Sequence, residues 1–251
     1  MARLSVNLNK IALLRNSRRT GVPDLAAFAR LALDAGARGI TIHPRPDERH
    51  IRRSDVPLLA KTIAAQRPHI ELNIEGYPDD RLMEICAEVK PEQCTLVPDA
   101  PDAFTSEEGW KLESAQLALV QPFITRLKAM GARVILFIDP SPAVLDRIKP
   151  AGADGVEIYT GSYAAAWRAG NHAALLDACA TTAKAAADRG LIVNAGHDLN
   201  LHNLPALMQR IPFLAEASIG HELTADALVM GFAGAVTAYA KALGPGASAH
   251  A

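Results

Sequence analysis

Residues 133–159, RVILFIDPSPAVLDRIKPAGADGVEIY, contain the unit that decides the fold. The runs at 133–139 and 154–159 are short, apolar and rich in β-branched residues, as is typical of parallel strands covered on both faces. Between them, Ser141 and Pro142 stand in the order of a helix N-cap residue and a first-turn proline. The segment is therefore predicted to form a strand, a helix and a second strand.

The same alternation extends outward from this unit along the chain. Further candidate strands lie at residues 4–8, 39–43, 69–75, 93–97, 191–194 and 216–219. Helical patterns separate them at residues 24–36, from 54, from 79, at 113–130 with a break at Pro122, at 172–189, 203–210 and 224–243, with a short extra helix within 160–171. Eight strands alternating with helices predict a parallel sheet. At 251 residues, this favours a closed (β/α)8 TIM barrel with extra helices over an open, doubly wound sheet.

One domain is expected to account for most of the chain. No linker interrupts residues 1–243, which we expect to form a single barrel domain, and GPGASAHA at 244–251 is expected to be a flexible C-terminal tail. Lysine and arginine total 26 and aspartate and glutamate total 27, for a net charge of −1. This balance argues against a nucleic-acid partner bound through its phosphates.

Several features favour a soluble, cytoplasmic protein. The N-terminal MARLSVNLNK lacks the apolar region of a signal peptide. The apolar stretch at 225–240 is interrupted by Asp226 and is too short to span a bilayer. Cys86, Cys94 and Cys179 form no C-x-x-C motif, so we expect buried, reduced thiols. No membrane partner is expected.

Polar side chains stand where the predicted strands stop. Those at or just beyond the carboxyl ends are Asn7, His43, Glu75, Glu157, His197 and His221. In a (β/α)8 barrel the carboxyl ends of all strands meet at one face, where barrel enzymes carry their active sites. A single strand-end histidine is more often structural, but the joint pattern predicts one acid/base site at this face.

Two loops near the end of the barrel have the composition of anion sites. Residues 194–197 and 218–221 each end in a Gly-His pair. Glycine lets backbone N–H groups approach an anion, and a helix N-terminus that follows adds partial positive charge. In the loop at 44–53, PRPDERHIRR, Arg45 and His50 are candidates for a second phosphate clamp. Two anion sites indicate either one bisphosphorylated substrate or two phosphorylated substrates.

Other kinds of chemistry are less compatible with these residues. Lys10 is the only lysine close to a predicted strand end, so a Schiff-base lysine is not expected. No Walker loop, G-x-G-x-x-G or G-x-S-x-G motif is present. One alternative stays open: a metal-dependent sugar-phosphate isomerase on the same fold, with a two-histidine, two-carboxylate site made of His43, Glu75, Glu157 and His197.

Seven motifs together resemble those of the pyridoxine 5′-phosphate synthase family, which closes the ring in vitamin B6 biosynthesis. They are VNLNKIALLRNSR, GITIHPRPDERHIR, NIEG, QCTLVPD, VEIYTGSYA, VNAGHDLN and SIGH, in order from about residue 4 to 243. The resemblance implies an octamer built from dimers that needs no metal or organic cofactor. It also implies condensation of 3-amino-2-oxopropyl phosphate with 1-deoxy-D-xylulose 5-phosphate to pyridoxine 5′-phosphate, phosphate and water.

The resemblance also implies roles for individual residues. It suggests a general base at His43, a second at Glu75, a general acid at His197 and a carboxylate at Glu157 that stabilises transition states. Positions similar to those that bind the amino-ketone phosphate or product are Asn7, Gly220 and His221. Positions similar to those that contact mainly the sugar phosphate are Arg18, Arg45, His50 and Thr105.

Three positions depart from the family pattern. Asn9 and Lys10 stand where many members have Asp-His, and Asp198 stands where many have glycine. Lys10 could meet a phosphate as a point charge, whereas Asp198 would repel one unless its side chain turns away to cap the next helix. We keep all three as candidate substrate contacts. The departures also leave open a non-catalytic, phosphate-binding paralogue.

Overall fold

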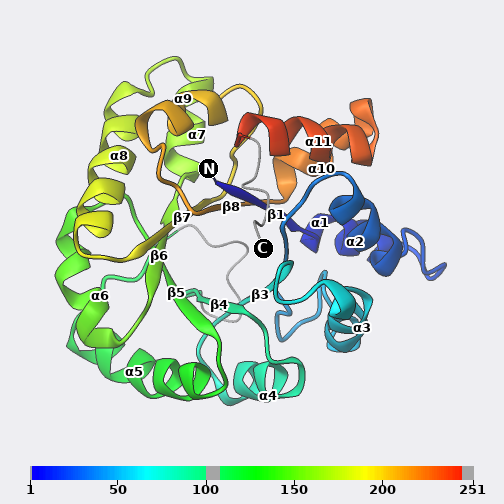
Figure 1. Ribbon diagram of the computed structural model, residues 1–251, viewed down its shortest axis with the longest axis horizontal. Helices are drawn as coiled ribbons and strands as arrows, with labels where there is room; N and C mark the ends of the chain where they lie inside the picture. Colours follow the sequence, from blue (N-terminus) through cyan, green and yellow to red (C-terminus); the bar gives the residue numbers. More distant parts are fainter. Residues whose placement is uncertain (1, 100–107, 245–251) are drawn as a thin grey trace.

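The structure, a computed structural model, describes residues 2–99 and 108–244. Eight parallel strands close into a barrel in chain order, as Figure 1 shows. They are β1 (Arg3–Asn7), β2 (Gly39–Ile42), β3 (Glu71–Gly76), β4 (Gln93–Leu96), β5 (Arg133–Ile138), β6 (Gly155–Tyr159), β7 (Ile192–Gly196) and β8 (Glu216–Ile219). Each predicted strand is found with ends shifted by at most two residues. The closed barrel is confirmed over the open sheet.

Helices surround the barrel on its outer side (Figure 1). They are α1 (Asn9–Asn16), α2 (Leu25–Asp34), α3 (Asp55–Thr62), α4 (Asp80–Val89), α5 (Ser114–Ala129), α6 (Leu145–Ala151), α7 (Gly161–Arg168), α8 (Ala173–Asp188), α9 (Leu204–Arg210), α10 (His221–Met230) and α11 (Phe232–Ala242). The extra helix expected within 160–171 is α7. The segment that became α1 carried no helix prediction.

Three helix predictions were wrong in detail. Pro122 does not break α5, because the helix is held by its apolar face against the barrel, and the proline lies exposed on the other face. The predicted helix at 224–243 is two helices, since Gly231 adopts a φ of 73° between α10 and α11. Ser141 and Pro142 hold the predicted N-cap and first-turn positions, but of a 3₁₀ turn, Pro142–Val144, that leads into α6, and the Ser141 side chain makes no capping hydrogen bond.

Side chains along each strand face alternately outward and inward. The outward-facing Val6, Ile40 and Leu72 are fully buried in the apolar core between barrel and helices. Most inward-facing residues are polar, with Ile135 and Phe137 on β5 as apolar exceptions, which differs from the expectation of strands that are apolar on both faces. Ser5 Oγ lies 2.6 Å from Thr41 Oγ1 on the neighbouring strand. The interior tolerates these groups because they hydrogen-bond to one another.

Nearer the amino ends of the strands, the interior carries a charged network. Glu71 accepts hydrogen bonds from both Arg3 and Arg133. Arg133 also donates to Gln93 Oε1 at 2.8 Å, and Gln93 Nε2 donates to Glu216 Oε1 at 2.9 Å. This network satisfies the buried charges below the site and makes the barrel wall rigid there.

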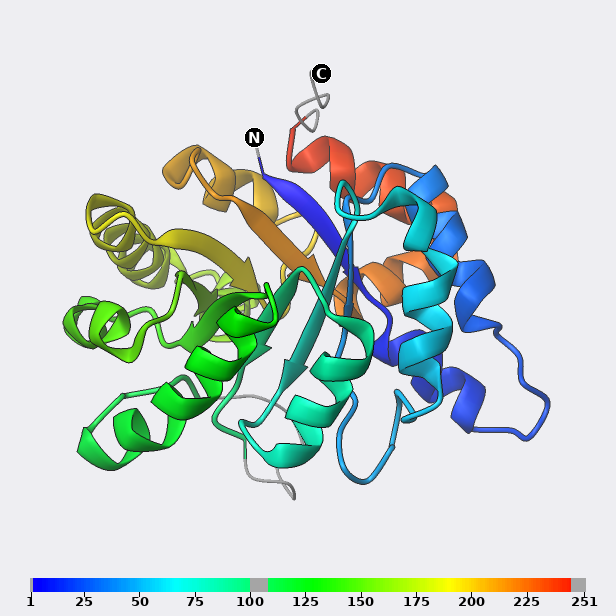
Figure 2. The ribbon, with the colours of Figure 1, turned by 60° about the horizontal axis from the view of Figure 1, so that its bottom comes forward.

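The loop between β2 and α3 extends beyond the carboxyl ends of the strands, drawn light blue in Figure 2. Two predictions lie outside the described residues: the site residue Thr105, and residues 245–251 of the expected tail. Within the described ranges, every helix is too short or too polar to cross a lipid bilayer.

Candidate active site

A cavity of about 390 Å³ opens at the carboxyl ends of the strands. Most of the predicted site residues line it, and they come from six strands or the segments that follow them: β1, β2, β3, β6, β7 and β8. Those that line it are Asn7, Asn9, Lys10, His43, Arg45, His50, Glu75, Glu157, His197, Asp198, Gly220 and His221. Barrel closure therefore gathers the predicted acid/base groups and the predicted anion contacts into one space.

Arg18 is the described candidate that the cavity does not include. It lies beyond the end of α1 and is exposed. Conversely, Leu13, Arg49 and Tyr159 line the cavity without having been named as candidates, and Ser218 lines it as part of the anion loop predicted at 218–221. Tyr159 and Ser218 stand two residues from the predicted site residues Glu157 and Gly220, on the same strand or at its end. The two-residue repeat of an inward-facing strand could have found both.

Two asparagines, one at the end of β1 and one at the start of α1, hold His43 and Glu75 in place. Asn9 Oδ1 accepts a hydrogen bond from the His43 amide at 2.9 Å, and Asn7 Nδ2 donates to Glu75 Oε2 at 3.3 Å. Asn7 Oδ1 in turn accepts from the Asn9 amide at 2.9 Å. His43 Nδ1 lies 4.0 Å from Glu75 Oε2. Asn9 acts through a side-chain oxygen that aspartate also has, so this departure from the family pattern preserves the contact.

Glu157 projects into the cavity from β6 against Gly196. A Cβ at Gly196 would lie 2.2 Å from Glu157 Oε1, so only glycine leaves room for the carboxyl group. Gly196 belongs to β7, and Asn194 Nδ2 bonds Gln93 Oε1 inside the barrel at 3.2 Å. Residues 194–196 thus end β7 rather than forming a loop, because β6 and β8 pair with them.

His197 leaves β7 in a left-handed backbone conformation, with a φ of 77°. The carbonyls of Gly196 and His197 accept from Thr160 Oγ1 at 2.5 and 2.7 Å. The His197 ring lies against Phe137 and Tyr159, with centroid distances of 5.1 and 5.4 Å. These contacts fix the direction in which the imidazole enters the cavity.

Asp198 also has a left-handed backbone, with a φ of 56°. Glycine adopts this conformation readily, and aspartate is among the other residues that tolerate it best. An Asp198 side chain at an anion site would repel the anion unless it turned away to cap the next helix. Instead Asp198 lines the cavity, and Asn203 occupies the N-cap position of α9. The cavity therefore carries a carboxylate beside His197.

The loop at 44–53 is anchored by buried charges. Arg15, on α1, donates to both carboxylate oxygens of Asp55 at 2.6 and 2.8 Å, and both side chains are almost fully buried. Asn16 Nδ2 donates to the His50 carbonyl at 2.8 Å. Arg45 is buried, and its Nη1 lies 3.3 Å from Asp99 Oδ2. These contacts place the Arg45 and His50 side chains at the cavity.

Burial lowers the pKa of each imidazole in the cavity. The pKa of His43 falls well below its ordinary value because of burial, with His50 and Arg45 adding to the effect. Burial, Arg45 and Lys10 lower the pKa of His50 to about 4. Burial also lowers the pKa of His197, although Asp198 opposes the shift. All three rings are therefore neutral at pH 7 and can accept protons.

The carboxyl groups shift in the opposite direction. Burial raises the pKa of Glu75 to about 8, and Asp99 and Glu216 add to the rise. Burial, followed by the charge of Glu75, raises the pKa of Glu157 well above its ordinary value. Neutral bases thus lie beside protonated acids at pH 7, which is the arrangement that proton-transfer catalysis uses.

Positive charge and backbone donors flank this acid/base set. Lys10, Arg45 and Arg49 line the cavity, and α10 begins at His221 with Gly220 at its N-cap position. A helix N-terminus and cationic side chains both favour an anion. In the ranges that the structure describes, no group of three or more histidine, cysteine, aspartate or glutamate side chains could hold a metal ion.

Fold and site together define a (β/α)8-barrel protein that carries an acid/base site for anionic small molecules. A family model described as pyridoxal phosphate biosynthesis protein PdxJ matches residues 4–244. The chain belongs to this family. It is 51% identical over 246 residues to the pyridoxine 5′-phosphate synthase of Allorhizobium ampelinum, covering 97% of this chain and 98% of that one. The synthase of Mesorhizobium japonicum is 50% identical over 244 residues, covering 97% and 99%.

Solved structures of low sequence similarity share the fold. Tryptophan synthase subunit alpha from Legionella pneumophila matches with a TM-score of 0.62 at 12% identity, covering 96% of this chain and 92% of that one. Phosphoribosyl anthranilate isomerase from Thermotoga maritima matches with a TM-score of 0.57 at 11% identity, covering 97% and 98%. These similarities support the barrel and carry no argument about the reaction.

Proposed function

We propose that this chain is a pyridoxine 5′-phosphate synthase. It condenses 3-amino-2-oxopropyl phosphate with 1-deoxy-D-xylulose 5-phosphate to give pyridoxine 5′-phosphate, phosphate and water, without a metal or organic cofactor. The observation that carries the proposal is the single cavity that unites His43, Glu75, Glu157 and His197 with flanking cations. The names of relatives at 50% and 51% identity support the same reaction.

His43 and Glu75 act as the two general bases. The reaction requires an amine to lose protons as it adds to a ketone, and a neutral His43 can accept one. With a pKa of about 8, Glu75 holds a proton at pH 7 in the free protein. Glu75 therefore acts as a base in its ionised form, whose share grows as the pH rises toward 8. His43 Nδ1 lies 4.0 Å from Glu75 Oε2, so the two bases face the same part of the cavity.

His197 acts as the general acid and Glu157 stabilises charge that develops in the transition state. In the free protein the pKa of His197 is lowered by burial, which leaves the ring neutral. A phosphate dianion in the cavity favours the protonated ring, because a nearby negative charge raises the pKa of a histidine. Substrate binding thereby supplies the acid that the loss of water and phosphate requires.

Two groups of residues hold the two phosphorylated substrates. Gly220, His221 and Asn7 bind the amino-ketone phosphate or the product at the N-terminus of α10. Arg45 and His50, with Lys10 as a point charge, bind the sugar phosphate. Fixing both phosphates in one cavity supplies the proximity that a two-substrate condensation needs.

Asn9 and Asp198 contribute at the edges of these subsites. Asn9 holds the His43 amide, and Asp198 contacts substrate from beside His197. A contact of Arg18 with substrate is not supported by this chain's own cavity, which Arg18 does not line. Thr105 lies outside the described residues.

The test is to incubate the purified protein with both substrates and follow the absorbance of pyridoxine phosphate. Product should form only when both substrates are present, and phosphate should be released in equal amount. Absence of product across pH 6 to 9 would favour a phosphate-binding paralogue without catalytic activity. Stoichiometric zinc or manganese, with activity lost to a chelator, would instead favour the metal-dependent isomerase.

We also propose that the protein is a cytoplasmic homo-octamer assembled from dimers. The family resemblance is the basis for the octamer, and exposed apolar side chains support self-association. At the end of α10, Leu228 is 81% and Val229 89% exposed. The free, buried thiols suit a reducing compartment. Sedimentation of the purified protein tests the octamer, and a species no larger than a dimer would contradict it. Cell fractionation tests the location.

A further inference from the structure

The segment that carries His43 and Arg45 has few backbone donors of its own. β2 ends at Ile42, and the next residues are His43, Pro44, Arg45 and Pro46. Neither proline has an N–H group. The Arg45 amide turns back to the His43 carbonyl at 2.9 Å. The Glu48 amide donates to the Arg45 carbonyl at 3.1 Å, and further donors to the carbonyls of this segment come from elsewhere in the fold.

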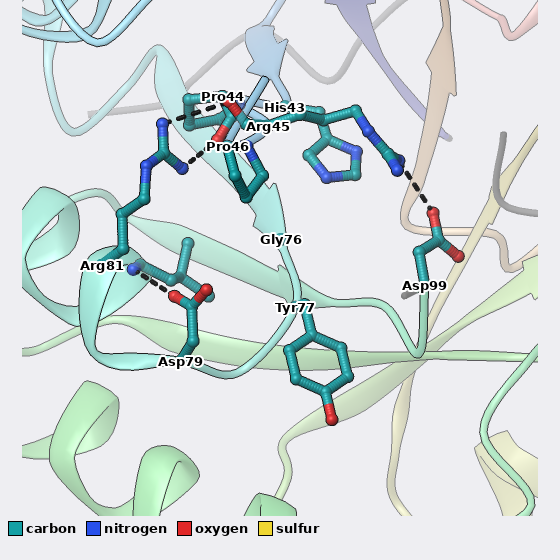
Figure 3. A pocket seen from close by; sticks show the side chains of 10 residues that line it. His43, Pro44, Arg45, Pro46, Gly76, Tyr77, Asp79, Arg81 and Asp99 are labelled. Carbon is teal, nitrogen blue, oxygen red and sulfur yellow. Dashed lines mark hydrogen bonds and ion pairs between the residues drawn. The ribbon is translucent and has the colours of Figure 1, made fainter. Parts of the chain in front are cut away.

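Arg81 supplies those donors from α4. Its Nη1 donates to the Pro44 carbonyl at 2.6 Å and its Nη2 to the Arg45 carbonyl at 3.2 Å. Figure 3 shows the guanidinium reaching both oxygens from one side, while the Arg45 side chain extends to Asp99 on the other. Two carbonyls in succession match the fork of a guanidinium, and an ammonium group cannot reproduce that geometry.

The space around this contact leaves little room for adjustment. A cavity of only about 20 Å³ lies between Arg81, His43 and Arg45, with Asp79 and Asp99 also on its wall. Asp79 is fixed because its carboxylate caps α4 by accepting from the Leu82 amide at 2.7 Å. Arg81, the second residue of α4, therefore lies in a first helical turn that is held by its cap. Movement of the segment at 43–46 relative to α4 would break its hydrogen bonds.

We propose that Arg81 is a positioning residue: by gripping the Pro44 and Arg45 carbonyls, it holds the His43 ring beside Glu75 and the Arg45 guanidinium at the cavity. This inference rests on the proposed function and adds to it a residue that lies outside the main cavity. Arg81 touches no reacting group. Its effect on the reaction passes through the backbone of the segment that it holds.

Arg81 also acts on His43 through charge. Together with His50, Arg45 and His197, its charge lowers the pKa of His43, while the Glu75 carboxyl group is the acidic neighbour at 4.0 Å. Removing the positive charge raises the pKa of His43. Because His43 acts as a base when neutral, the part of the acidic limb of the pH–rate profile that reports His43, below the ionisation of Glu75, then moves to higher pH.

The test compares Arg81→Met, Arg81→Lys and a control, Arg126→Met. Arg126 is half-exposed on α5 and pairs with Asp80 at 3.1 Å, so it touches the first turn of the same helix without contacting the segment at 43–46. Steady-state kinetics with both substrates, pH–rate profiles and thermal unfolding are measured for each. Arg81→Met should lower kcat by about 10- to 100-fold, the scale expected when a catalytic group is misplaced by about 1 Å.

The other readouts separate positioning from a structural role. In Arg81→Met, KM for each substrate should change less than kcat, because Asp99 still pairs with the Arg45 guanidinium. The part of the acidic limb that reports His43 should move to higher pH in the same variant. Arg81→Lys keeps the charge but not the fork, so it should keep the position of the acidic limb and still lose about 5-fold or more in kcat. Arg126→Met should match the wild type. Two results would overturn the proposal: a wild-type kcat in Arg81→Lys, or an unmoved acidic limb in a folded Arg81→Met. If Arg81→Met does not fold, the kcat of Arg81→Lys alone decides the proposal.

An NMR titration of His43 makes the result independent of the reaction. Arg81→Met should raise the pKa of His43 and shift its ring resonances, whereas Arg126→Met should do neither. If the wild type makes no pyridoxine phosphate but the His43 titration responds as expected, the proposed function fails and the positioning role stands. If the wild type is active but neither kcat nor the titration responds, the positioning role fails alone.

Discussion

Replacing Glu75 by glutamine should slow the reaction and, at the same time, stabilise the fold at alkaline pH. The Glu75 side chain is only 13% exposed, and burial raises its pKa from 4.5 to about 8. In the unfolded chain the same group ionises near its ordinary value. Between those two pH values the folded protein therefore holds a proton that the unfolded chain has already released.

The sign and size of the effect follow from this proton. Where the folded state binds one proton more than the unfolded state, the free energy of unfolding falls by about 1.4 kcal/mol per pH unit. The wild type should thus lose about 4 kcal/mol of stability at this site between pH 5 and pH 8. Glutamine has nearly the same shape and no titrating proton, so Glu75→Gln removes this loss. Its stability relative to the wild type should rise by about 4 kcal/mol over that range.

Urea unfolding of the wild type and Glu75→Gln at pH 5, 6.5 and 8 measures this difference. Glu84→Gln, on the exposed side of α4, is the control and should follow the wild type at every pH. Turnover of Glu75→Gln should fall by at least ~100-fold, the scale for losing a positioned base. A stability difference that does not change with pH would show that Glu75 ionises normally, and near-normal turnover would show that its role is misassigned.

Three further substitutions test other parts of the site. His197→Asn should cut turnover at least ~100-fold while substrate affinity, measured by calorimetry, changes much less; a folded variant with near-normal turnover would contradict the acid role. Arg45→Ala should mainly raise KM, by about 10- to 100-fold, through the loss of charge-assisted hydrogen bonds, and an unchanged KM for both substrates would count against it. Gly196→Ala should displace the Glu157 carboxyl group, which would lie 2.2 Å from the new Cβ, and lower kcat; Gly234→Ala, with 3.8 Å to the nearest atom, should leave kcat unaltered.

The order of residues along the chain was enough to predict the eight strands and the barrel. Alternation of apolar runs with helical patterns is a local signal, and a strand such as β8 was placed at residues 216–219 without error. Because parallel strands in a closed barrel end at one face, the residues His43, Glu75 and His197 could be assigned to a common site before their distances were known.

Contacts between distant segments could not be predicted in this way. Nothing near Arg81 in the chain indicates that its guanidinium holds the Pro44 carbonyl, and nothing near Arg15 indicates Asp55 as its buried partner. The same holds for Gly196, which looked like part of an anion-binding loop until Glu157 was seen to occupy the space beside it. Periodicity and propensity depend on neighbours in the chain, whereas these interactions depend on which strands and helices the closed barrel brings side by side. The strand pattern and the location of the site thus follow from local sequence. The protonation states and the orientations of the site's side chains arise only when burial and long-range contacts form.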